Sequence, residues 1–158
     1  MKKLKLALMA MLAVVVTVGC SSDSKEEGTE SNVSVVEVGN KIIEEGYIRM
    51  PLEITEQQAE EIYHIDGDVV EEYSILKTGI SPGTGFAFII KAKDGQLDAA
   101  KAIVEQVKND TIANAFYPEE QEAAEQAEII ENGNVLALLI FDSEIKEEAI
   151  NLYKELVK

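Results

Sequence analysis

The residue types that most often carry out catalysis are scarce in this chain of 158 residues. His64 is its single histidine, and Cys20 is its single cysteine. A catalytic histidine needs a nucleophile beside it and an acid that orients it, and Asp66 or Asp68 could supply only the acid. We therefore interpret His64 as a residue near a helix C-terminus, where it interacts favourably with the helix dipole. The sequence predicts no catalytic residue and no cofactor.

Metal binding has a better candidate in the segment DGDVVEE, whose four carboxylates are Asp66, Asp68, Glu71 and Glu72. Hard cations such as calcium bind several oxygen ligands from a bent loop. A calcium loop closes with an acid at its twelfth position, and this segment has none there. Glu71 and Glu72 should also point to opposite faces of a strand. Asp66 and Asp68 are thus weak metal candidates, and a helix end followed by a solvated edge strand is the favoured interpretation.

Two further segments are candidates for contact with a partner. The loop GISPGTG, residues 79–85, is rich in glycine, but no lysine and no helix follow it as a phosphate-binding loop requires. We interpret it as a hairpin connection in which Ile80 could contact a partner. Phe116 and Tyr117 lie in a predicted loop and form the second candidate. The alternative for this pair is a lid on the core.

The N-terminus predicts where the protein resides. A basic start, MKKLK, precedes an apolar run over residues 6–18 and then Gly19-Cys20. This order describes a secretory signal peptide, and the run is too short to span a bilayer. The stretch VTVGC resembles the lipobox of bacterial lipoproteins, which implies cleavage before Cys20 and a lipid on its thiol. The alternative is a plain secreted protein with a spare thiol.

The segment SSDSKEEGTESN, residues 21–32, has no apolar residue and predicts a disordered tether. We therefore divide the chain into a signal peptide (1–19), a lipidated cysteine with its tether (20–32) and one globular domain (33–158). Removal of residues 1–19 takes away three lysines and no acid, so the formal charge would change from −16 to −19. Such a charge argues against nucleic-acid binding. We expect an anchored protein on the extracytoplasmic face of the cell membrane.

Hydrophobic periodicity predicts the elements that position these residues. Helices are expected over 33–45, over a short segment after the capping box at Thr55, over 97–109 and over a last segment from 145. Strands are expected over 69–78 and 86–92. A hairpin should join 127–131 to 135–141 through an Asn132-Gly133 turn. The last strand, VLALLIF, is apolar on both faces and should lie centrally.

These elements predict an α+β fold. We expect a four-stranded antiparallel sheet with two long helices packed on one face, in a ββαββα-like order, and a helical N-terminal lead-in.

Four motifs occur in an order that is similar to one bacterial family of unknown function, numbered 4358. They are YHIDGDVVEEYSI, FAFIIKAKD, YPEE and NGNVLALLIFD. The resemblance extends over residues 35–158. It implies a short lipoprotein of Gram-positive-type bacteria and no assigned activity. The residues that match the family's tendencies are Tyr63, Asp66, Glu72, Tyr73, Asp94, Tyr117 and Pro118.

Three functions remain open. The favoured one is a non-enzymatic, lipid-anchored binding or assembly module that contacts an envelope protein or glycan. The second is a binder of a small ligand or cation, for which a dry interior without a cavity would be contrary evidence. The third is an envelope hydrolase, which requires two carboxylates about 5–10 Å apart in a cleft.

Overall fold

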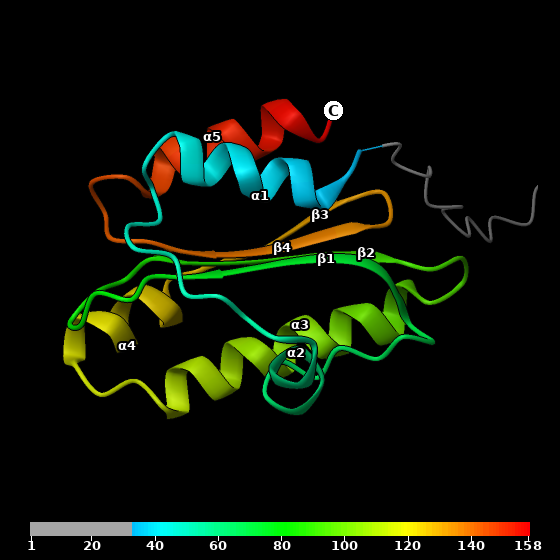
Figure 1. The fold of residues 1–158 in the computed structure, drawn as a ribbon, viewed down its shortest axis with the longest axis horizontal. Coiled ribbons are helices and arrows are strands. Elements are labelled where there is room, and N and C mark those ends of the chain that lie inside the picture. The colour runs from blue at the N-terminus through cyan, green and yellow to red at the C-terminus, as the bar shows by residue number, and fades with distance from the viewer. Residues whose placement is uncertain (1–32) are drawn as a thin grey trace, which may run out of the picture.

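The computed structural model describes residues 33–158, which form three layers (Figure 1). A four-stranded antiparallel sheet lies in the middle, with strand order β1-β2-β4-β3. Its strands are β1 (Val70–Lys77), β2 (Phe86–Ala92), β3 (Ile129–Asn132) and β4 (Val135–Ile140). The predicted signal peptide, Cys20 and the tether lie outside the described residues. Within 33–158, no helix combines the length and the apolar character needed to cross a bilayer.

Helices cover both faces of the sheet. On one face lie α1 (Val35–Glu44) and α5 (Lys146–Leu156), and on the other lie α2 (Glu56–Glu61), α3 (Leu97–Ala113) and α4 (Pro118–Glu125) (Figure 1). The antiparallel sheet and the central place of VLALLIF are confirmed. The prediction that the two long helices share one face is wrong, because α3 and α5 pack into separate cores. The physical reason is that β2 and β4 are apolar on both faces, and each face needs its own cover.

The core on the first face joins α1 and α5 to alternate residues of β2 and β4. Val35, Val38 and Ile42 form the buried stripe of α1. The Glu72 carboxylate of β1 accepts hydrogen bonds from the Val35 backbone N–H at 2.9 Å and the Ser34 hydroxyl at 2.6 Å. A carboxylate at a helix N-terminus satisfies otherwise unpaired N–H groups, so Glu72 fixes α1 to the sheet edge.

The core on the second face contains an aromatic cluster. Tyr63, which follows α2, stacks on Phe86 of β2 with ring centroids 5.9 Å apart, and Phe88 lies 6.4 Å from Phe86. Ala100, Val104 and Val107 bring α3 onto these rings and their neighbours. The capping box at Thr55 is confirmed, with Thr55 and Gln58 bonded to each other's backbone N–H. This cap starts α2 close enough to the sheet for Tyr63 to reach the core.

The predicted β3–β4 hairpin is confirmed, but its turn residues differ from the expected pair. Asn132 is paired with Val135, so Gly133 and Asn134 form the turn. Gly133 has φ of +59° and Asn134 does not have a positive φ, as in a turn with glycine at its first central position. Asn132 is therefore the last strand residue, and its side-chain amide donates to the carbonyl of Val157 beyond α5.

Tyr153 is the largest side chain buried completely in the first core. Its hydroxyl is the one buried side-chain polar atom of residues 33–158 that has no hydrogen-bond partner. A buried hydroxyl without a partner loses its hydration and gains nothing in return. Burial also raises the pKa of Tyr153.

We expect Tyr153→Phe to stabilise the protein. Removal of the unpaired hydroxyl should raise the free energy of unfolding by about 1 kcal/mol at pH 7. The wild type should also lose stability as pH rises above about 10, because this tyrosine ionises more readily in the unfolded chain. Urea unfolding from pH 7 to pH 11 measures both effects. A variant that is less stable at pH 7 would show that the hydroxyl has a favourable role.

Candidate functional site

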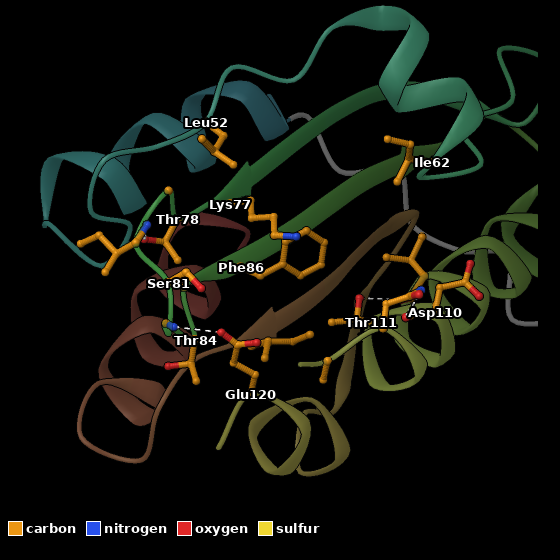
Figure 2. Close-up of a pocket in the computed structure, with 18 of the residues that line it drawn as sticks. Leu52, Ile62, Lys77, Thr78, Ser81, Thr84, Phe86, Asp110, Thr111 and Glu120 are labelled. Atoms are coloured by element: carbon orange, nitrogen blue, oxygen red, sulfur yellow. Dashed lines mark hydrogen bonds between the residues drawn. The ribbon is translucent and has the colours of Figure 1, made fainter. Parts of the chain in front are cut away.

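A pocket of about 520 Å³ opens where the β1–β2 loop faces the C-terminal end of α3 (Figure 2). Phe86, Val107 and Ile140 belong to its apolar floor and are buried. Its rim is mostly polar and draws on segments far apart in the sequence. The lining residues on the rim and walls include Leu52, Ile62, Lys77, Thr78, Ile80, Ser81, Thr84, Asp110, Thr111, Asn114 and Glu120. The pocket has the size and mixed lining of a small-molecule site.

Lys77 is positioned by the regular alternation of β1. Side chains of a strand alternate between faces, so Tyr73, Ile75 and Lys77 share the face that α2 and α3 cover. Lys77 pairs directly with Phe86 across the two strands. Figure 2 shows its side chain directed from β1 toward the Phe86 ring. Lys77 thus follows Tyr73 and Ile75 on the same face of β1, at the point where the helices no longer cover the strand.

The β1–β2 loop is held by bonds on two sides. The Gly83 N–H donates to Oε1 of Glu120 on α4 at 3.0 Å. The Thr78 hydroxyl donates to the Arg49 carbonyl at 2.7 Å and accepts from the N–H of Ile80. These bonds fix the loop between α4 and the segment that precedes α2. The pocket wall is therefore formed in the free protein.

His64 and Asp110 join two elements that line the pocket. His64, at φ of +58°, directs Nε2 to Oδ2 of Asp110 at 2.8 Å. The other carboxylate oxygen of Asp110 accepts from Gln106 at 2.9 Å. The hydrogen bond from His64, with that from Gln106, lowers the pKa of Asp110. His64 lies three residues beyond α2 and serves as a link to α3, and no serine within residues 33–158 is bonded to it.

We expect Asp110→Asn to weaken the fold at neutral pH. A carboxyl whose pKa is lowered by folding stabilises the native state above its usual pKa, near 4, and this contribution is lost as pH falls. The variant should therefore be less stable than the wild type at pH 7, and the two should converge below pH 4. Thermal unfolding from pH 3 to pH 7 tests this, with Glu105→Gln on the same helix as the control. Parallel pH profiles for all three proteins would contradict the assignment.

The structure brings one predicted contact residue into this site and places two at its margin. Ile80 lines the pocket and is half-buried, so it is not a freely exposed loop tip. Phe116 is 84 % exposed and lies directly after Ala115, which lines the pocket. Its ring packs edge-on against Tyr117 at 5.1 Å. Phe116 covers no part of the core, and its predicted role in partner contact stays a prediction.

Of the two weak metal candidates, the Asp66 carboxylate is already engaged in a local hydrogen bond. Oδ1 of Asp66 accepts the backbone N–H of Asp68 at 2.8 Å, in a local turn. Glu71 pairs with Lys91 at 3.2 Å, whereas Glu72 is bonded to the start of α1. Across residues 33–158, no group of three or more histidine, cysteine, aspartate or glutamate side chains could hold a metal ion. The four carboxylates of DGDVVEE diverge.

Sequence reasoning missed Lys77, Glu120 and the C-terminal part of α3 as site residues. The sequence did contain a signal for Lys77, because a lysine on the otherwise buried face of a strand indicates where the helices stop covering that face. Glu120 lies in an acidic run that is typical of a solvated helix face. Only the tertiary structure brings it to the β1–β2 loop.

Comparison with known sequences identifies the family of the chain. Residues 45–141, more than half of the chain, match the family described as "Domain of unknown function (DUF4358)". No curated protein and no solved structure matches it. The matched range includes the whole sheet and the pocket. The chain therefore belongs to the DUF4358 family.

Proposed function

We propose that this protein is a lipid-anchored, non-enzymatic binding module of the cell envelope, and that the pocket beside the β1–β2 loop is its ligand site. The observation that carries the proposal is the pocket itself. Its volume is about 520 Å³, although a domain this small has little room for a pocket. Its rim offers hydrogen-bonding groups that have no partner within residues 33–158, and its apolar floor is buried. This combination is typical of sites that bind small molecules.

The binding role is favoured over hydrolysis by the state of the pocket carboxylates. Asp110 and Glu120 both line the pocket, as a carboxylate-dependent hydrolase would require. Such an enzyme needs one acid with a raised pKa to protonate the leaving group. The pKa of Asp110 is instead lowered, and Glu120 holds the loop through Gly83. These two carboxylates support structure and ligand orientation.

The proposed anchor is the lipid on Cys20, with the signal peptide cleaved between Gly19 and Cys20. The support is the residue order at the N-terminus and the resemblance of VTVGC to a lipobox. The wild type should fractionate with membranes, and Cys20→Ala should not. A Cys20→Ala protein that stays in the membrane fraction would contradict the anchor. In the anchored protein, we propose that an envelope protein or glycan contacts the domain at Ile80, Phe116 and Tyr117.

The ligand site can be tested with the full-length protein in detergent. Ligand-observed NMR against a library of small polar compounds should find compounds that bind the wild type. Thr84→Phe, which fills the pocket, should abolish their binding. Val36→Phe adds the same ring at a 45 % exposed position of α1 on the opposite face and should leave binding unchanged. A library without a binder, or binding that Thr84→Phe does not alter, would contradict the proposal.

A further inference from the structure

We propose that the pocket binds a small zwitterion of the amino-acid and short-peptide class. In this arrangement the ligand carboxylate pairs with Lys77 and the ligand ammonium pairs with Glu120. The inference rests on the proposed function, because it assumes that the pocket is a ligand site. The class of ligand follows from the charged groups of the pocket that have no partner within residues 33–158.

The site for the ligand carboxylate is defined by Lys77. Among the described residues that line the pocket, it is the one basic side chain. Its ammonium group has no hydrogen-bond or ion-pair partner within residues 33–158. Lys41, Lys91 and Lys101 pair with carboxylates of the chain, whereas the charge of Lys77 is available to a ligand in the pocket. The hydroxyls of Ser81 and Thr84 on the loop add two further donors, for which the described part of the chain offers no partner.

The site for the ligand ammonium is defined by Glu120. One of its oxygens accepts the Gly83 N–H, and the other has no partner in the described part of the chain. Asp110, the second carboxylate of the pocket, already accepts a hydrogen bond on each oxygen. Glu120 is therefore the acceptor that remains for a cation. Figure 2 shows Lys77 and Glu120 entering the pocket from β1 and α4, with Phe86 between them.

Only a ligand with both charges matches this arrangement. A simple anion would pair with Lys77 but would be repelled by Glu120, Asp110 and the net charge of the chain. A simple cation would meet the ammonium of Lys77. The pocket also has apolar walls, including Leu52 and Ile62, which are about half exposed and can cover an aliphatic side chain. A volume of about 520 Å³ limits the ligand to a small molecule.

The test uses four probes that differ only in their terminal charges: Ala-Ala, its N-acetyl form, its C-terminal amide, and the form blocked at both ends. Binding to the full-length protein in detergent is measured by titration calorimetry at low ionic strength. Ala-Ala should bind about fivefold more tightly than either singly blocked probe, as expected for partly exposed ion pairs. Lys77→Gln should remove the preference for the free carboxylate only, and Glu120→Gln the preference for the free amine only.

Matched controls carry the same charge changes on the opposite face. Lys154→Gln and Glu155→Gln in α5 should leave all four affinities unchanged. Failure of Ala-Ala to bind, or equal affinity for all four probes, overturns the zwitterion assignment. If library compounds still bind and Thr84→Phe still blocks them, the proposed function stands and only the ligand class is wrong. If no library compound binds either, both proposals fail together.

Discussion

Phe88→Ala should cost about 3–5 kcal/mol of the free energy of unfolding, the largest effect that we expect from a single substitution. Phe88 is fully buried in β2 and packs within 6.4 Å of both Phe86 and Tyr63, measured between ring centroids. Its removal leaves a cavity in the core that supports the floor of the pocket, where the neighbouring strands cannot collapse. Since a domain of this size has about 5–15 kcal/mol in total, much of its stability would be lost.

Urea unfolding followed by circular dichroism measures this loss. Phe116→Ala is the matched control, because the same ring is removed from a position that is 84 % exposed. Its effect should stay within about 0.5 kcal/mol. If Phe88→Ala does not fold, Phe88→Leu should retain the fold with a smaller loss of about 1 kcal/mol. Equal effects of the two alanine variants would contradict the placement of Phe116 outside the core.

Gly39→Ala should have the second largest effect, although alanine favours helices. Gly39 lies in α1 where the helix crosses β1. A Cβ at this position would lie 2.0 Å from Oγ of Ser74 and 3.1 Å from its Cβ. The helix propensity of alanine favours the variant by about 1 kcal/mol, and overpacking against the sheet costs about 1–3 kcal/mol or more. At 2.0 Å the clash dominates, so we expect a net loss of about 2 kcal/mol.

A double-mutant cycle separates this clash from other causes. Ser74→Ala removes the oxygen at 2.0 Å and leaves the Ser74 Cβ contact at 3.1 Å, which small shifts can relieve, and an ordinary contact with Cδ1 of Leu76 at 3.5 Å. Gly39→Ala should therefore be far less damaging in the Ser74→Ala background, with a coupling free energy above 1 kcal/mol. Urea midpoints of the four proteins give that number. Additive effects of the two substitutions would mean that α1 does not approach β1 at Ser74.

The sequence predicted the elements better than their packing. The Thr55 cap, the four strands and the central β4 follow from local signals such as capping residues and alternation. The faces occupied by α3 and α5 do not, because the periodicity of a helix shows which side is buried but not against which surface. The relevant information lay in β2 and β4, whose buried residues fill both faces. Two apolar faces require two helical layers.

The candidate site was predictable only in part, for a related reason. Ile80 was selected because its loop is rich in glycine, and it does line the pocket. Lys77 and Glu120 are separated by 43 positions in the sequence. Lys77 belongs to none of the motifs named above, and Glu120 closes the YPEE motif, which gives no sign of a charged partner. Both residues line one pocket because the fold brings the end of β1 near the start of α4, which no local pattern encodes. A ligand-binding role can be inferred for a charged side chain only once the structure shows whether that side chain already has a partner.

The strand order also has a consequence for how the chain folds. Each outer strand pairs with a neighbour in sequence, β1 with β2 and β3 with β4, so both hairpins close short loops. The β2–β4 pairing instead joins residues about fifty positions apart, for example Phe88 with Leu138, and α3 and α4 lie between them in the chain. Closing that long loop costs chain entropy before any core contact can compensate. The β2–β4 pairing should therefore be the slow step, and the pocket, whose floor holds Phe86 from β2 and Ile140 from β4, exists only after it.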